Sequence, residues 1–241
     1  MSNFKLRFLN ICIKNIQMLL PQNCLLCAAR CGHLLLCAAC AEQLPRLPAS
    51  RCAVCAVPVS GAVCGACLAH PPRYDEVTAA FSYQHPLDAL VQAFKYGGNL
   101  ALATLLGDAL GRTAATAATP RPDLIIPMPL TARRLRERGF NQALELARRV
   151  SAATGIPVAA GICRKVAETQ PQAALPWRER AKNVRGAYVC DADLQGRKIA
   201  VIDDVMTTGA TLNELAKNLK HAGATRVSGW VVARAPRKSG I

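Results

Sequence analysis

Four pairs of cysteines constrain this chain more than any other feature of its sequence. Each pair has the spacing C-x-x-C, and two residues between thiolates let one tight turn direct both sulfurs at a single ion. Eight such thiolates are the ligand set of two tetrahedral four-cysteine zinc sites, which would stabilise a small module and catalyse nothing. The pairs are Cys24 and Cys27, Cys37 and Cys40, Cys52 and Cys55, and Cys64 and Cys67.

The spacing of these knuckles leaves their pairing open. Nine residues separate Cys27 from Cys37, and eight separate Cys55 from Cys64. These intervals suit two small ribbons formed by sequential knuckles, and a crossed arrangement of the first knuckle with the fourth is the alternative. A redox function needs one C-x-x-C beside a βαβ pattern rather than four in a proline-rich stretch, so structural zinc is favoured.

The first twenty residues must be examined for an export signal, because this decides in which cellular compartment we expect the protein. The first twenty residues are apolar and basic, but charges interrupt the apolar run, and Pro21 and Cys24 follow without a small-residue cleavage site. We expect a short amphipathic helix, with contact to a membrane surface as the alternative. No run reaches the roughly 18 apolar residues of a membrane span. We therefore expect a cytoplasmic protein, in which clustered cysteines bind metal rather than form disulfides.

Strands and helices alternate after Pro71-Pro72, which we take as the boundary between a ribbon module over 1–72 and a second domain over 73–241. This alternation predicts an α/β domain with a mainly parallel sheet. The sequence predicts strands over 75–83, 123–127, 158–163, 198–203 and 227–233, helices over 87–94, 100–110, 140–153 and 210–222, and a long loop over 164–185. Cys163 and Cys190 are expected to be isolated, buried small hydrophobes.

The segment 199–211 carries the clearest chemistry. An apolar strand delivers Asp203 and Asp204 at its carboxyl end, and a loop of small residues then leads into a helix. Ligands bind at this edge of an α/β sheet, where backbone N–H groups at a helix start attract a phosphate and Gly209 permits close approach. The two acids suit sugar hydroxyls or Mg²⁺. Further hydroxyl donors are Thr207, Thr208 and Thr211.

Three other interpretations of this segment compete. Acids after an apolar strand are also found in nucleoside triphosphatases, but the chain has no G-x-x-x-x-G-K-[ST] motif, which disfavours that class. The threonines could serve only as helix caps. The site could also be a relic that folds without working.

The run from Val201 to Thr211, VIDDVMTTGAT, resembles the phosphoribosyl-pyrophosphate (PRPP) loop of type I phosphoribosyltransferases. Other segments resemble the ComF family, and with the double zinc ribbon they cover nearly the whole chain. These segments are Phe94–Gly97, Ile126–Leu130, Arg134 to Gln142 with its RGFNQ ending, and Thr169-Gln170 to Arg180 and Asn183. The resemblance implies a type I phosphoribosyltransferase-like fold, a mainly parallel sheet with helices on both faces.

The resemblance also implies a ligand and the residues that hold it. The ligand would be PRPP or a related phosphorylated ribose with Mg²⁺, and the catalytic groups would be Asp203, Asp204 and Arg133. A surface position for Lys95 is the equal alternative to its place in the pocket. The implied PRPP-binding residues are Asp203, Asp204, Thr207, Thr208, Gly209, Ala210, Thr211, Leu130, Thr131, Arg134, Arg138, Lys95, Thr169, Gln170, Arg180 and Asn183.

Two functions from different classes follow. The first is a phosphoribosyltransferase with an unassigned acceptor. The second is a non-catalytic single-stranded-DNA-binding or adaptor protein, because the resemblance links the chain to natural transformation and implies a DNA-uptake helicase or other transformation proteins as partners. A formal charge of +15 fits a polyanionic ligand, whereas an aromatic content of 5% argues against a base-stacking platform. Phosphate electrostatics would then dominate any DNA affinity.

Overall fold

The computed structural model describes residues 22–117, 120–167 and 183–236. The chain divides into two compact units, Met1–Leu44 and Pro45–Ile241. The expected N-terminal helix lies outside the described residues, as do Thr169, Gln170 and Arg180. The division after Leu44 falls inside the ribbon module that we expected over residues 1–72. The domain boundary at residue 72 stays a prediction.

Both units contain the same knuckle turn. The amide of Ala28 donates to the carbonyl of Cys24 in the first unit, and Ala56 donates to Cys52 in the second. Ala28 and Ala56 both have positive φ, 59° and 57°, which closes the turn after each C-x-x-C. A short helix follows the third cysteine of each set, namely α2 (Ala38–Glu42) and α3 (Gly65–Ala69).

Four parallel strands form the sheet of the larger unit in the order β1-β6-β5-β2. In this order Gly229 of β6 lies between Val77 of β1 and Val201 of β5, and Ile126 of β2 pairs with Val201. The strands are β1 (Glu76–Ser82), β2 (Leu124–Pro127), β5 (Lys198–Met206) and β6 (Arg226–Arg234).

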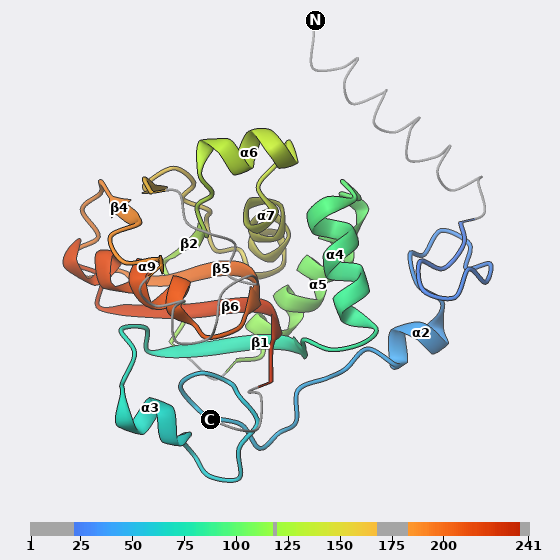
Figure 1. Ribbon diagram of the computed structural model, residues 1–241, viewed down its shortest axis with the longest axis horizontal. Helices are drawn as coiled ribbons and strands as arrows, with labels where there is room; N and C mark the ends of the chain where they lie inside the picture. Colours follow the sequence, from blue (N-terminus) through green and yellow to red (C-terminus); the bar gives the residue numbers. More distant parts are fainter. Residues whose placement is uncertain (1–21, 118–119, 168–182, 237–241) are drawn as a thin grey trace, which may run out of the picture. The chain divides into compact units, whose positions relative to one another are not determined.

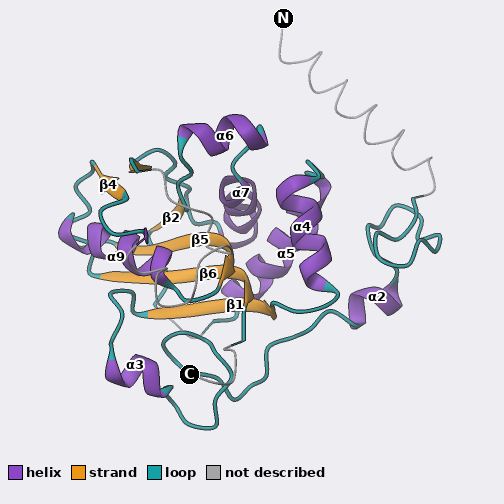
Figure 2. Ribbon diagram, viewed as in Figure 1, coloured by secondary structure: helices purple, strands orange, loops and turns teal. Residues whose placement is uncertain are grey.

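Helices cover both faces of this sheet (Figure 1). One face carries α5 (Ala101–Ala115) and α7 (Gln142–Thr154), with α4 (Leu87–Tyr96) beside α5. The other face carries α9 (Ala210–His221), as Figure 2 also shows. Every residue of β6 after Arg226 is buried, which is the pattern of a central strand in a sheet covered on both sides. Helix α6 (Ala132–Arg138) lies in the chain between β2 and α7.

A separate two-stranded antiparallel ribbon, β3 (Cys163–Lys165) and β4 (Tyr188–Cys190), corrects two predictions. The strand expected over 158–163 is wrong, because Val158 makes only an isolated bridge to Ile125 and Cys163 begins β3. Cys163 and Cys190 are not isolated either. They face each other in register with their sulfurs 2.9 Å apart.

The fold class that the resemblance implies, a mainly parallel α/β sheet with helices on both faces, preceded in the chain by a double zinc ribbon, is confirmed. None of the described helices combines the length and the apolar character needed to cross a bilayer.

Candidate functional site

A pocket of about 630 Å³ opens at the carboxyl ends of the parallel strands. This is the edge where the sequence placed a ligand. Its walls come from the end of β5 and the start of α9, from the loop after β2, from α4, and from the β3–β4 ribbon. Of the predicted ligand-binding residues it is lined by Asp203, Asp204, Thr207, Thr208, Gly209, Thr211, Leu130, Arg134, Arg138 and Lys95.

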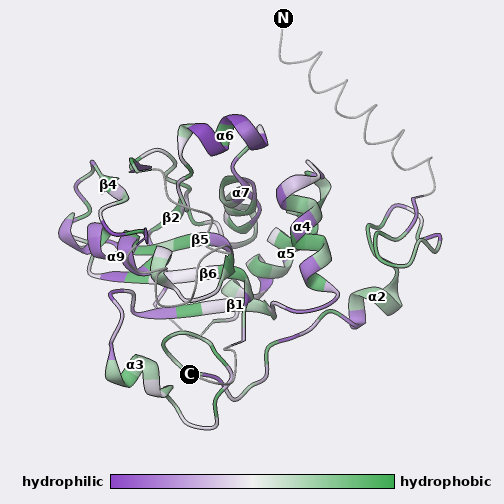
Figure 3. Cartoon of the chain, in the orientation of Figure 1, coloured by the Kyte–Doolittle hydropathy of each residue, from purple (hydrophilic) through white to green (hydrophobic). Residues whose placement is uncertain are grey.

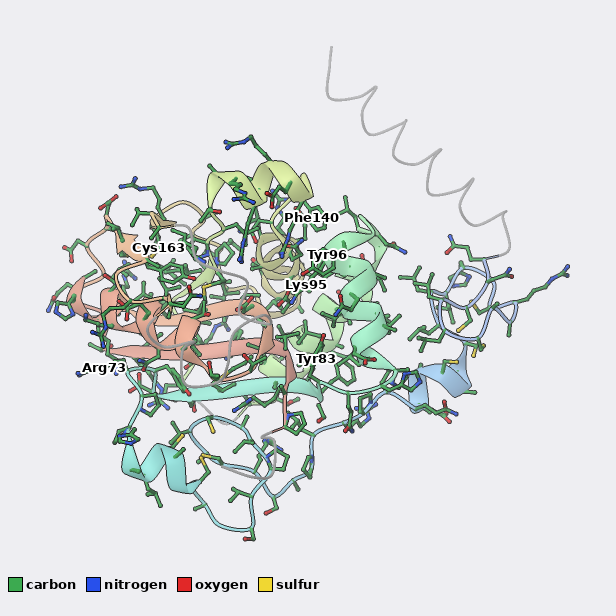
Figure 4. All side chains as sticks on the ribbon, in the orientation of Figure 1. Arg73, Tyr83, Lys95, Tyr96, Phe140 and Cys163 are labelled. Carbon is green, nitrogen blue, oxygen red and sulfur yellow. The ribbon has the colours of Figure 1, made fainter. Side chains whose placement is uncertain are left out.

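An ion pair fixes one of the two acids. Lys95 at the end of α4 places its Nζ 3.0 Å from Oδ1 of Asp204, and both side chains are largely withdrawn from solvent, with exposures of 21% and 10%. Lys95, Tyr96 and Tyr83 can be followed in Figure 4, on the side of the sheet where α4 lies. The lysine therefore belongs to the pocket, and the alternative of a surface lysine is wrong.

The second acid is held in an unfavourable environment. Burial raises the pKa of Asp203 to about 7, the neighbouring Asp204 adds to the rise, and Lys95 opposes it. Burial by itself would lower the pKa of Lys95, but its pairing with Asp204 outweighs this and raises that pKa. One ammonium group therefore does not neutralise two adjacent carboxylates. With both acids ionised, the pocket carries excess negative charge that a second cation could balance.

The loop between β5 and α9 presents backbone N–H groups to the pocket. Gly209 caps the helix with a left-handed φ of 83°, and the N–H groups of the first turn of α9 have no acceptor within the helix. The left-handed φ favours glycine here, and a Cβ on Gly209 would lie 2.6 Å from Cε of Met206 and 2.9 Å from Oη of Tyr74, so these side chains would have to shift. Ala210 does not line the pocket, and its amide donates to Oγ1 of Thr208 at 3.1 Å.

The RGFNQ run joins three elements at the pocket wall. Gly139 ends α6 with a φ of 77°, and Asn141 caps α7 by accepting from the amides of Ala143 and Leu144. Asn141 also donates to the carbonyl of Met128 after β2. Gln142 is buried, donates to the carbonyl of Lys95 and accepts from Arg138. These bonds fix α4, α6 and α7 relative to one another.

Several predicted residues lie elsewhere in α6 and beyond. Thr131 is buried as the N-cap of α6, where its hydroxyl accepts from the amide of Arg134. Arg133 pairs with Glu137 at 2.7 Å and does not line the pocket. Asn183 is described and has a partner, but it is not a lining residue. The catalytic role of Arg133 and the contacts of Asn183 stay predictions.

Sequence reasoning missed part of the wall. Met128 follows β2, Asn141 and Gln142 stand in a motif that was noted without roles, and Lys165 and Tyr188 come from the unpredicted β3–β4 ribbon. The other missed lining residues include Tyr83, Gln92 and Tyr96. The period of α4 could have indicated Gln92, three residues before Lys95, as a neighbour of that lysine.

Two four-cysteine clusters fit structural zinc. Their sulfurs lie within 4.8 Å of one another, and the sets are Cys24, Cys27, Cys37 and Cys40, and Cys52, Cys55, Cys64 and Cys67. Sulfur separations of 3.7 Å for Cys27 and Cys37 and 3.6 Å for Cys55 and Cys64 match the roughly 3.8 Å edge of a tetrahedron with Zn–S bonds of about 2.3 Å. The knuckles therefore pair sequentially.

Comparison with known proteins agrees with this organisation. A double zinc ribbon domain matches residues 15–68. Competence protein F of Haemophilus influenzae is 34% identical over 209 residues, covering 83% of this chain and 90% of that protein. The chain belongs to the ComF family. Another relative, the DNA utilization protein YhgH of Escherichia coli K12, is 30% identical over 222 residues, covering 89% of this chain and 97% of that protein.

Solved structures that resemble this ComF protein include phosphoribosyltransferases. The glutamine PRPP amidotransferase of Bacillus subtilis superposes with a TM-score of 0.40 and 19% identity, covering 58% of this chain and 30% of that one. The purine phosphoribosyltransferase of Pyrococcus horikoshii gives a TM-score of 0.34 with 20% identity, covering 59% and 77%.

Proposed function

We propose that the pocket binds PRPP or a related phosphorylated ribose together with Mg²⁺, and that the protein is a phosphoribosyltransferase whose acceptor is unassigned. One observation carries this proposal: Asp203 and Asp204 lie near the end of β5, which ends at Met206, and after only Thr207 and Thr208 the chain reaches Gly209, which caps α9 in a left-handed conformation. This order places anion acceptors for sugar hydroxyls beside N–H donors for a phosphate.

Different residues of the pocket would bind different groups of the ligand. The N–H groups at the start of α9 and the hydroxyls of Thr207, Thr208 and Thr211 would hold the 5-phosphate. Asp203 and Asp204 would hold the ribose hydroxyls. Arg134 and Arg138 of α6, which also line the pocket, would clamp the pyrophosphate.

This arrangement suits a reaction without a covalent nucleophile. Departure of pyrophosphate leaves positive charge on the sugar ring and negative charge on the leaving group, so positioning and electrostatics supply the catalysis. Mg²⁺ prefers carboxylate oxygens, and the adjacent Asp203 and Asp204, which both line the pocket, would supply them. When bound, Mg²⁺ would neutralise part of the charge on the leaving group.

Calorimetric titration of PRPP tests the proposal. We expect one site per chain with Mg²⁺ present, and weak or no binding with EDTA, with Asp203→Asn or with Asp204→Asn. Asp123→Asn is the matched control, because Asp123 precedes β2 and its carboxylate accepts from the amide of Lys198 at the opposite edge of the sheet. Absence of heat from the wild-type protein would reject the proposal.

The second candidate function is DNA binding. Relatives are named competence protein F and DNA utilization protein, from which we infer a role in DNA uptake for this chain. Helix α6 favours direct contact with the DNA backbone, since none of its residues is buried and it carries four arginines (Figure 3). Single-stranded DNA binding without any PRPP binding would favour this function over the enzyme.

A further inference from the structure

A buried arginine connects the second four-cysteine site to the loop over residues 207–211 that leads into α9, here called the phosphate loop. The second site is formed by Cys52, Cys55, Cys64 and Cys67. Arg234, the last residue of β6, is 1% exposed. Its Nε donates to the carbonyl of Cys55 at 2.7 Å. Its Nη1 donates to the carbonyls of Met206 and Thr207, at 3.1 and 2.6 Å, and to that of its neighbour Ala235 at 2.7 Å. One planar group therefore holds a zinc knuckle and the start of the phosphate loop together.

The charge of Arg234 is as informative as its geometry. Its hydrogen-bond partners among the described residues are carbonyl oxygens, and a buried guanidinium without a carboxylate is costly. Four thiolates around one Zn²⁺ leave two negative charges on one side of this arginine. A phosphate held by the loop would supply negative charge on the other side. Arg234 is thus placed to compensate both anionic centres.

Tyr74 makes a second connection between the same two places. It is 5% exposed, and its hydroxyl lies against Gly209, 2.9 Å from where a Cβ would stand. Tyr74 also packs in the same buried cluster as Cys55 and Cys67 of the second site. Tyr74 therefore packs with the cysteines of the second site, and its hydroxyl lies against the helix start that we assign to the phosphate.

We propose that Arg234 is a positioning residue that couples metal occupancy of the second four-cysteine site to ligand binding at the phosphate loop. Because coupling between two sites is reciprocal, metal at the second site strengthens phosphate binding, and bound phosphate ligand strengthens zinc binding by the same factor. The identity of the ligand rests on the proposed function, whereas the link between ribbon and loop does not. The first four-cysteine site, in the other unit, is the internal comparison.

The first test uses the wild-type, zinc-loaded protein. Transfer of zinc to a chromogenic chelator is followed with and without PRPP and Mg²⁺. We expect the ligand to reduce the release of one of the two zinc ions at equilibrium, which corresponds to a rise in zinc affinity of about fivefold or more, the lower end of typical coupling. Unchanged release of both ions, in a protein that calorimetry shows to bind PRPP, would overturn the coupling.

The second test needs no PRPP. Amide hydrogen exchange over residues 207–211 should accelerate about tenfold or more in Arg234→Met, with faster zinc loss from the second site. Arg234→Lys keeps the charge but cannot span the carbonyls, so zinc retention should recover while loop protection does not. Arg226→Met, at the other end of β6 where Arg226 pairs with Glu76, is the control.

These two tests distinguish a failure of the proposed function from a failure of the link between ribbon and loop. If the wild-type protein binds no PRPP, the proposed function fails, and hydrogen exchange in the variants still decides the link between ribbon and loop. Wild-type exchange and zinc retention in a folded Arg234→Met protein would overturn the inference. If that variant does not fold, amide exchange over 207–211 is measured instead in the wild-type protein after partial zinc removal. Unchanged protection of this loop would then overturn the inference.

Discussion

Lys95 and Asp204 form an ion pair of 3.0 Å that joins the end of α4 to the end of β5. This pair sets the electrostatics of the pocket, because the same lysine opposes the rise in the pKa of Asp203 that burial and Asp204 produce. Binding that needs an ionised Asp203 should therefore strengthen as the pH rises through about 7.

Replacing Lys95 with Met should move this pH dependence. Without the ammonium group the pKa of Asp203 rises further, so the midpoint of the PRPP affinity profile shifts to higher pH, and affinity at pH 7 falls roughly tenfold. Titrations between pH 6 and 9 measure the shift. Lys217→Met, on the exposed side of α9, should leave the profile unchanged. An unshifted midpoint in Lys95→Met would show that the lysine does not control Asp203.

The same acid should lower stability as the pH rises. Asp203 holds its proton up to about 7 in the folded chain but only to about 3.8 when unfolded, so the folded state binds more protons between these values. Stability from this group is therefore lost across that window. Asp203→Asn removes the effect and should stabilise the protein by at least about 1 kcal/mol at pH 8 and by nothing near pH 4.

Thermal unfolding at both pH values measures this difference. Asp204→Asn is the informative neighbour, because it leaves the buried ammonium of Lys95 without its carboxylate and should destabilise the protein at pH 8. Equal melting temperatures for Asp203→Asn and the wild type at pH 8 would contradict the raised pKa.

Gly209→Ala should damage the phosphate loop in two ways. The residue has a φ of 83°, and its added Cβ would collide with Met206 and Tyr74. We expect a loss of stability of about 2 kcal/mol and at least a tenfold loss of PRPP affinity. Gly196→Ala is the control, because Gly196 has a φ of 75° but open space around its Cβ position. It should lose about 1 kcal/mol of stability and no affinity.

DNA affinity should depend on α6 if the second candidate function holds. Arg136 is exposed near the middle of this helix. Arg136→Gln should weaken binding to single-stranded oligonucleotides of any sequence and reduce the slope of log affinity against log salt by about 1. Arg148→Gln, on α7 where Arg148 pairs with Glu145, should leave the slope unchanged. Equal slopes for wild type and Arg136→Gln would exclude α6 from the contact.

Local patterns predicted the features of this fold that depend on neighbours in sequence. The cysteine spacing indicated both four-cysteine sets, and the apolar run before Asp203 and Asp204 indicated β5 and the pocket edge. Strand β5 continues three residues beyond Asp203, to Met206, because its last residues still pair with β6. Periodicity could not show this, since acids ordinarily mark the end of a buried strand.

The remaining features depend on contacts between distant segments. Gly139 ends α6 in a left-handed conformation, and the helix expected over 140–153 begins only at Gln142, after Asn141 has bonded to Met128. The short β3–β4 ribbon has too few residues for a periodic signal, and its partners are 27 residues apart at Cys163 and Cys190. Arg234 gave no signal because its role comes from Cys55 and Thr207, which only the folded chain brings beside it.

The most direct test of the central claim is a map of the backbone amides that respond to PRPP and Mg²⁺. In ¹⁵N–¹H spectra of the zinc-loaded protein, we expect the largest shifts at Thr208, Gly209 and Thr211, with smaller ones at Lys95 and Arg138, and their loss in Asp204→Asn. Saturating ligand that leaves the amides of 207–211 unmoved, or that moves only amides outside the pocket, would contradict the assignment of this loop as the phosphate site.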